Sequence, residues 1–123
     1  MLYSDLDNLK EINDTFGHHA GDEILVAAAG IFKDTFRESD IIARIGGDEF
    51  VVIPIGSSID DVKVITERLR QNLENRNARK DGEHRLSISF GTAYYDPEFP
   101  GSIDELVIQA EKLMYEQKIN KRP

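Results

Sequence analysis

The sequence contains no cysteine among its 123 residues, which excludes disulfides and thiolate metal sites. This absence suits a reducing compartment, and we expect a cytoplasmic location. Long hydrophobic runs are missing as well. The longest apolar candidate, residues 24–31, is far shorter than the roughly 18 residues of a membrane span. The first five residues lack the basic region and apolar core of a signal peptide, so we expect no membrane contact within this segment.

Positive charge is also scarce, because 15 Lys and Arg stand against 23 Asp and Glu and give a formal net charge of -8. Broad nucleic-acid binding depends on basic surface, so we expect no nucleic-acid partner. A small phosphate ligand stays compatible, since metal ions and a few local cations can offset its charge. The composition, 40% hydrophobic and 31% charged, is that of one globular domain rather than a disordered chain.

Hydrophobic spacing predicts helices over residues 8–16, 20–36, 58–73 and 102–119, and strands over residues 2–4, 41–45, 50–55 and 86–94. Two β-branched runs around Gly46 and Gly47 are typical of a β-hairpin. The polar residues 75–85 are expected to form a loop. The order β-α-α-β-β-α-β-α predicts an α+β fold, an antiparallel sheet packed with helices.

The predicted order of strands and helices is short at both ends. The first strand is only three residues long, and the chain stops just past its last helix. We therefore expect residues 1–123 to form one domain that lacks an N-terminal helix and a C-terminal edge strand.

Carboxylates gather at two predicted turns: Asp5 and Asp7 follow the first strand, and Asp48 and Glu49 lie at the hairpin tip. Such positions suit Mg²⁺, which prefers oxygen ligands and usually binds one or two carboxylates together with substrate phosphates. Glycines before the acids let a bulky phosphate approach the backbone. Most acidic turn residues are merely solvated, however, so this pattern alone is weak evidence for a site.

The string Gly46-Gly47-Asp48-Glu49-Phe50 resembles the motif that names the GGDEF family of diguanylate cyclases. The resemblance extends over almost the whole chain. Residues 4–14 are similar to the family's first strand and metal segment, 17–22 to its nucleotide segment, 40–45 to the lead into the hairpin, 87–91 to a strand that usually reads S-I-G, and 111–118 to its final helix. Several motifs in one order are far more specific than one motif.

This resemblance implies a palm-like, nucleotide-cyclase-like fold with a ferredoxin-like core. It also implies diguanylate cyclase activity, the condensation of two GTP molecules into cyclic di-GMP with release of two pyrophosphates. Each protomer would bind one GTP, so catalysis requires a homodimer. A regulatory domain is expected elsewhere in the full-length protein.

Carried over residue by residue, the resemblance implies Mg²⁺ or Mn²⁺ held by the carboxylates of Asp5 and Asp48 and the backbone carbonyl of Leu6. Asp48 occupies the position that the family treats as essential for catalysis. Glu49 is the next candidate catalytic residue, as a ligand of a second metal or through water. Divalent metal would polarise the α-phosphate and lower the pKa of the attacking 3′-hydroxyl. Whether Asp48 also takes the proton stays open.

For the base of GTP, the resemblance implies Asn13 and Asp22, with His18 nearby; Gly46 and Gly47 belong to the same substrate site. An ionised Asp only accepts hydrogen bonds, which suits the N1–H and amino group of guanine. Ordinary structural roles also remain open: Asp22 as a helix-start acid, Asn13 as a surface polar group and His18 as a cap.

For the β- and γ-phosphates the resemblance implies Lys118 and Arg122, which lie four residues apart on the last helix. Their alternative role is that of favourable cations at a helix C-terminus. The ending departs from the family pattern, because Lys121 stands where Gly is usual and Pro123 follows Arg122 directly. This departure leaves the geometry of Arg122 open.

An R-x-x-D motif, Arg37 to Asp40, precedes the hairpin at the spacing the family uses for its inhibitory product site. Arg37 would pair with phosphate or guanine oxygens of cyclic di-GMP, and Asp40 with the guanine donor edge. Arg68 is a weaker, secondary contact. The alternative is a salt bridge at a helix end.

Two other functions are weighed against the enzyme. One is a catalytically inactive GGDEF-like module that binds GTP or cyclic di-GMP as a sensor. The other is a polymerase-like or adenylate-cyclase-like palm, which shares the acid pair but does not need Asp22 or the R-x-x-D motif. The enzyme is favoured because a degenerate sensor usually loses some of the motif residues, and here they are intact.

Overall fold

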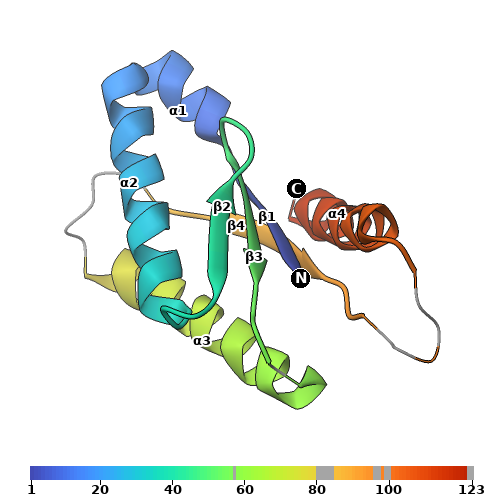
Figure 1. Cartoon of the computed structure of the whole chain (residues 1–123). Helices are drawn as coiled ribbons and strands as arrows, with labels where there is room; N and C mark the ends of the chain where they lie inside the picture. The colour runs from blue at the N-terminus through green and yellow to red at the C-terminus, as the bar shows by residue number, and fades with distance from the viewer. Residues whose placement is uncertain (57, 80–84, 96–97, 99–100, 122–123) are drawn as a thin grey trace.

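A computed structural model describes residues 1–56, 58–79, 85–95, 98 and 101–121. Its strands are β1 (Leu2–Leu6), β2 (Ile41–Arg44), β3 (Glu49–Ile53) and β4 (Ile88–Thr92). They form one antiparallel sheet in the order β2-β3-β1-β4. The first strand therefore lies inside the sheet, and its C-terminal end is beside the starts of β3 and β4 (Figure 1).

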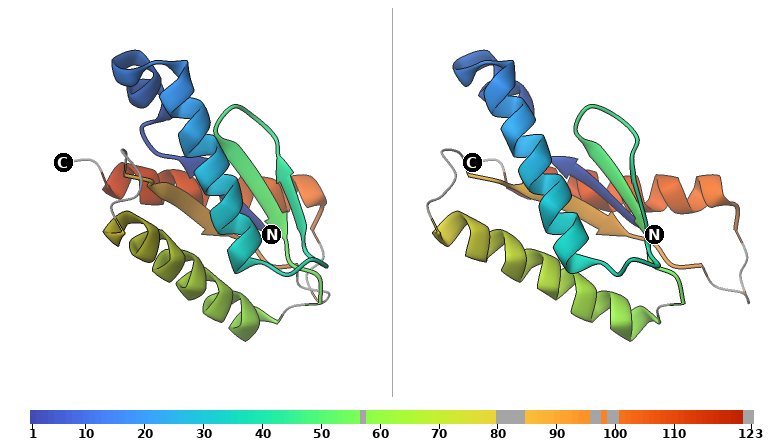
Figure 2. Two further views of the ribbon diagram at one scale, coloured as in Figure 1. Left: turned by 90° about the vertical axis from the view of Figure 1, so that its left-hand side faces the viewer. Right: turned by 60° about the vertical axis from the view of Figure 1, so that its left-hand side comes forward.

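The helices are α1 (Leu9–Phe16), α2 (His18–Thr35), α3 (Ile59–Ala78) and α4 (Ile103–Asn120). Helices α2 and α3 lie on one face of the sheet, and α4 lies on the other (Figure 2). Helix α1 packs against α2 beyond the end of β1. None of these described helices is long and apolar enough to cross a membrane.

Side chains of β1 alternate between two cores because successive strand residues point to opposite faces. Leu2 and Leu6 belong to the larger core under α2 and α3, whereas Tyr3 belongs to a smaller core with Ala110 and Met114 of α4. Asp5 lies two residues after Tyr3 and therefore faces α4 as well. This register turns a metal-binding candidate toward the helix that carries the predicted phosphate-binding lysine.

The predicted element order, the antiparallel sheet and the β-hairpin are confirmed. The loop predicted over residues 75–85 is wrong for residues 75–78, because α3 continues to Ala78, and residues 80–84 lie outside the described part of the chain. The strand predicted from residue 86 begins instead at Ile88. The reason is Asn77, whose side-chain amide donates to the Leu86 carbonyl at 2.9 Å and accepts from the Leu86 amide at 2.9 Å. Leu86 thus pairs with a helix side chain in place of a neighbouring strand.

Candidate functional site

The acidic residues of the two predicted turns meet where β1 runs alongside β3. Asp5 is the register partner of Glu49, and the Leu6 amide donates to the Asp48 carbonyl at 2.9 Å. Within the described residues, carboxylate oxygens of Asp5, Asp48 and Glu49 all lie within 4.8 Å of one another. Two segments more than forty residues apart in sequence therefore supply one cluster of negative charge.

The Asp5 side chain of this cluster is largely enclosed, with 12% of it exposed. Its Oδ1 is buried and has no hydrogen-bond partner, while Oδ2 accepts from Lys118 Nζ at 2.9 Å. Burial raises the pKa of Asp5 to about 6; the Lys118 ammonium opposes this shift and Asp48 adds to it. An orphaned carboxylate oxygen beside two further carboxylates fits a divalent cation with oxygen ligands.

Glu49 is held in place by Tyr3, whose hydroxyl donates to Glu49 Oε2 at 2.5 Å. Burial, followed by the acceptors Glu49 and Glu111, raises the pKa of the Tyr3 hydroxyl above its usual value. The hydroxyl therefore stays protonated and remains a donor. One Glu49 oxygen is thereby engaged by the protein.

Two lysines of the last helical turn hold the end of β1. Lys118 Nζ also lies 3.4 Å from the Leu6 carbonyl. Lys121, the C-cap residue of α4, donates to Asp7 Oδ2 at 2.9 Å and to the Ile88 carbonyl at 2.8 Å. The last turn of α4 is thus tied to both β1 and β4.

Asp7 is the centre of a second polar network beside the carboxylate cluster. It accepts from Ser87 Oγ at 2.6 Å and from Ser89 Oγ at 2.8 Å, in addition to Lys121. Burial by itself raises the pKa of Asp7, but the donors Ser87, Lys121 and Ser89 outweigh it and lower the pKa below its usual value. Asp7 is therefore a fixed anion that serves the structure of this edge.

A cleft of about 870 Å³ opens beside these groups. Basic and acidic side chains share its wall, and the lining residues are Leu6, Asp7, Asn8, Leu9, Lys10, Glu11, Asp48, Arg85, Ser87, Lys118 and Lys121. Asn8 has φ 64°, in the left-handed region, where the chain turns from β1 into α1. Cations and carboxylates side by side suit a phosphate ester that arrives with a divalent metal.

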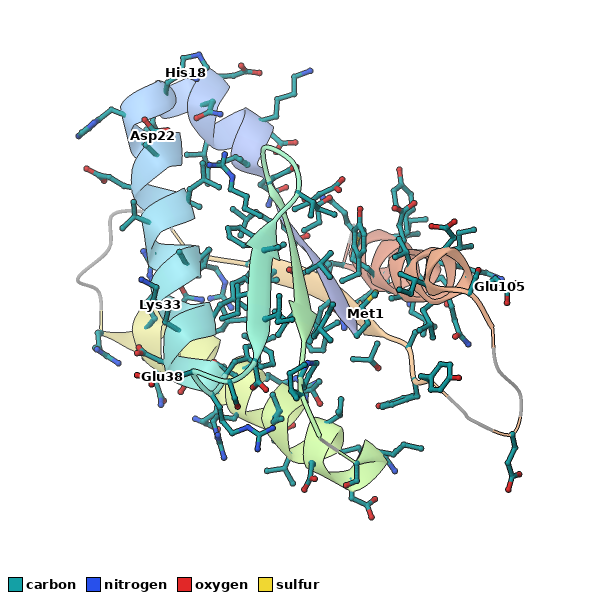
Figure 3. All side chains as sticks on the ribbon, in the orientation of Figure 1. Met1, His18, Asp22, Lys33, Glu38 and Glu105 are labelled. Carbon is teal, nitrogen blue, oxygen red and sulfur yellow. The ribbon has the colours of Figure 1, made fainter. Side chains whose placement is uncertain are left out.

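The residues predicted for the base lie together at the corner between α1 and α2. His18 and Asp22 project there from the first turns of α2 (Figure 3), and both are exposed. Asn13 lies on α1, and its Oδ1 is buried without a partner. The absence of a side chain at Gly21 allows the Asn13 amide to pack against α2, since a Cβ at Gly21 would collide with that oxygen. An exposed carboxylate beside an unpaired amide oxygen can accept hydrogen bonds from a guanine donor edge.

A family model described as "Diguanylate cyclase, GGDEF domain" matches residues 1–123. The chain belongs to the GGDEF family. Diguanylate cyclase A of Treponema denticola is 37% identical to it over 123 residues, which cover 99% of this chain and 33% of that protein. The chain thus spans about a third of the length of this curated relative.

Solved GGDEF domains share its fold. The GGDEF domain of YfiN from Pseudomonas aeruginosa is 37% identical, with a TM-score of 0.84 over 98% of this chain and 76% of that chain. The GGDEF domain of DgcB from Caulobacter crescentus, solved in complex with c-di-GMP, is 26% identical, with a TM-score of 0.82 over 98% of this chain and 72% of that chain. These neighbours have the predicted palm-like α+β fold.

The hairpin of this GGDEF domain is closed by Arg44, an arginine outside the predicted site residues. Arg44 Nε donates to the Gly46 carbonyl at 3.1 Å, and Nη2 donates to the Gly47 carbonyl at 2.8 Å. Neither glycine has a positive φ, and a Cβ at Gly47 would meet nothing within 4 Å. Packing among the described residues therefore does not require Gly47, whose bare backbone is open to a ligand.

The R-x-x-D residues of the GGDEF domain contact each other in the loop between α2 and β2. Arg37 Nη2 lies 3.4 Å from Asp40 Oδ1, with side chains 56% and 0% exposed. The Asp40 carboxylate accepts from the backbone amides of Arg37 at 2.9 Å and Ile55 at 3.0 Å. Arg68 Nη1 donates to the Thr35 carbonyl at 3.5 Å. Arg37 is the accessible member of the pair, while Asp40 ties the loop together.

Arg122 lies outside the described residues, so its predicted phosphate contact stays a prediction. No local pattern indicated the structural roles of Tyr3, Asp7, Ser87 and Ser89. Only Lys121 carried a visible signal, its departure from the family ending.

Proposed function

We propose that this GGDEF domain is a catalytically competent diguanylate cyclase that condenses two GTP molecules into cyclic di-GMP and releases two pyrophosphates. The observation that carries the proposal is the carboxylate cluster of Asp5, Asp48 and Glu49, which shares one edge of the sheet with Lys118. Phosphoryl transfer needs groups that position a triphosphate and neutralise its charge more than it needs covalent chemistry from the protein.

Asp5, Asp48 and the Leu6 carbonyl would hold Mg²⁺ or Mn²⁺, and Glu49 would act directly or through water. When bound, the metal supplies Lewis-acid polarisation of phosphate oxygens and shields their charge. Tyr3 orients Glu49 through its 2.5 Å hydrogen bond. The protein thus prepares oxygen ligands from two strands before a nucleotide arrives.

Substrate recognition is assigned to two places. Asn13 and Asp22 would read the guanine edge at the α1–α2 corner, with His18 beside them, while Gly46 and Gly47 admit the nucleotide at the hairpin. Lys118 and Arg122 would bind the β- and γ-phosphates. The mixed charge of the 870 Å³ cleft supports this division, since it places cations next to the metal candidates.

One chain can hold one GTP in this scheme, so two protomers must meet for the 3′-hydroxyl of one nucleotide to attack the α-phosphate of the other. Cyclic di-GMP is also proposed to inhibit at Arg37, with Asp40 and Arg68 nearby. A regulatory domain would lie in the rest of a longer protein. The need for a GTP pool places this domain in the cytoplasm in our proposal.

The deciding experiment is incubation with GTP or ATP plus Mg²⁺, followed by identification of the product. We expect cyclic di-GMP from GTP and no cyclic dinucleotide from ATP. Asp48→Ala should lower the rate at least about a hundredfold, as expected for loss of a key electrostatic group. GTP binding should survive, because the base contacts lie elsewhere.

Asp34→Ala is the matched control, because Asp34 is an exposed carboxylate of α2 outside the cluster. Near-normal turnover by Asp48→Ala would remove the assigned role. Binding of GTP or cyclic di-GMP by the wild type without any product would instead support a sensor module.

A further inference from the structure

Lys118 contacts two of the groups that would hold the proposed metal. Its ammonium lies 2.9 Å from Asp5 Oδ2 and 3.4 Å from the Leu6 carbonyl. These two groups are two of the three ligands assigned to the metal under the proposed function. The side chains of Lys118 and Asp5 are also well enclosed, since they are 22% and 12% exposed.

Lys118 leaves Asp5 Oδ1 unengaged. A divalent metal held by Asp5 and the Leu6 carbonyl would nevertheless lie against the Lys118 ammonium, where the two positive charges repel each other. A metal that binds Asp5 and Leu6 must therefore displace Lys118. Removing Lys118 without a replacement would leave a half-buried carboxylate unpaired, which is costly. The Lys118 ammonium thus supplies the positive charge that a bound metal would otherwise bring to Asp5.

The surroundings allow the side chain to move while its helix stays fixed. Gln117 Oε1 accepts a hydrogen bond from the Phe90 amide at 2.8 Å, and Lys121 Nζ donates to Asp7 and to the Ile88 carbonyl. These contacts fasten the last turns of α4 to β1 and β4. Lys118 lines the 870 Å³ cleft, and its flexible four-carbon stem can swing the ammonium into that space.

We infer that Lys118 is a displaceable internal cation that couples metal binding to triphosphate binding. In the absence of ligand it neutralises Asp5 and competes with the metal for Asp5 and Leu6. When metal takes those ligands, the released ammonium turns into the cleft and binds phosphate. Lys118 thereby opposes binding of the metal alone and favours binding of the metal together with a triphosphate. The inference rests on the proposed function for the identity of these ligands.

The test uses Mn²⁺ alone, with no nucleotide, and measures its affinity by electron paramagnetic resonance for wild type, Lys118→Met and Lys121→Met. Lys118→Met should bind Mn²⁺ at least about tenfold more tightly, since the competition for its ligands is gone. Lys121→Met is the matched control: it removes the same charge from the same helical turn, but its partners are Asp7 and Ile88. Its Mn²⁺ affinity should stay within about threefold of wild type, because the lost charge acts on the proposed metal ligands only from a distance.

A second arm measures the affinity for pyrophosphate in the presence of saturating Mn²⁺. Lys118→Met should bind pyrophosphate at least about tenfold more weakly, because the released ammonium is missing. A residue that merely stabilises the fold would not strengthen one ligand and weaken the other. Opposite changes in the two affinities would support the coupling.

A measurement on the wild type guards against misfolding of the variant. The Cε–Hε nuclear magnetic resonance signal of Lys118, assigned with Lys118→Arg, should shift when Mg²⁺ alone is added, while the Lys121 signal should stay in place. Equal Mn²⁺ affinity in wild type and Lys118→Met, including no binding by either, would overturn the inference. So would equal tightening in both methionine variants, or a Lys118 signal that Mg²⁺ does not move. Product formation from GTP is scored separately, so either proposal can fail alone.

Discussion

At the scale of single residues, two side-chain oxygens in the described part of the chain are buried without a hydrogen-bond partner, Asp5 Oδ1 and Asn13 Oδ1. Such an atom costs roughly 1–3 kcal/mol of stability. One belongs to the proposed metal site and the other to the proposed guanine site. Both costs have the same explanation in our proposal, since a bound ligand would supply the missing partner.

A substitution at Gly21 tests whether Asn13 Oδ1 contacts the nucleotide. We expect Gly21→Ala to weaken binding of a non-hydrolysable GTP analogue about tenfold, or ~1.4 kcal/mol, because the added Cβ would push the Asn13 amide away. Calorimetric titration would measure the affinity.

Gly30→Ala is the matched control on the same helix, because a Cβ at Gly30 would meet nothing within 4 Å. It should leave GTP affinity unchanged and raise the free energy of unfolding by up to ~1 kcal/mol through helix propensity. Unchanged affinity in Gly21→Ala would show that Asn13 does not contact the nucleotide.

At the scale of secondary-structure elements, the loop after α2 is joined to the segment after β3 by Asp40. Its wholly buried carboxylate accepts from the Arg37 and Ile55 amides. Burial by itself raises the pKa of Asp40, but these backbone donors and the Arg37 guanidinium outweigh it and lower the pKa below its usual value. The carboxylate thus closes the base of the β2–β3 hairpin.

This lowered pKa sets the sign of a pH dependence. The ionised carboxylate stabilises the fold above the unfolded-state pKa of about 3.9, and the contribution is lost as the pH falls through the lower folded-state pKa. Asp40→Asn should lower the free energy of unfolding at pH 7 by about 1–3 kcal/mol. It should also reduce the loss of stability between about pH 4 and pH 2. Urea unfolding at both ends of this range measures both effects.

Asp34→Asn is the control for the Asp40 substitution, because it removes an exposed carboxylate that closes no loop. It should leave both the stability at pH 7 and the acid-induced loss close to wild type. The same acid-induced loss in wild type and Asp40→Asn would contradict the assigned role of the carboxylate.

At the scale of the whole molecule, the described residues of one chain supply one carboxylate cluster, whereas the proposed reaction joins two nucleotides. Initial rates per milligram should therefore rise with protein concentration and fall on dilution below the dimer dissociation constant. With a net charge of -8, self-repulsion opposes association, so moderate salt should increase activity at a fixed low concentration.

Sedimentation run beside the rate measurements completes this test. A dimer that appears over the same concentration range as the activity would support the assembly. Constant activity per milligram in a species that sediments as a monomer throughout would contradict the requirement for two protomers.

Local periodicity was enough to predict the elements and their order, because it reports which residues face a core. Ser58 and Asp61 form a capping box at the start of α3, where a helix was predicted to begin, and the two β-branched runs form the hairpin. Local pattern could not place the end of α3, since its last turn is held by the hydrogen bonds between Asn77 and Leu86. It also could not show Asp40 bound to backbone amides.

Which polar groups meet depends on how the elements pack in three dimensions. Lys118 and Asp5 are 113 residues apart, and they touch because β1 lies between β3 and β4 while α4 packs on the face toward which Asp5 points. Lys121 stood out in the sequence as a departure, and its role as the tie between α4, Asp7 and Ile88 emerged from the fold. Periodicity identifies the face of an element, whereas the partner across that face depends on strand order and helix packing, which no local pattern specifies.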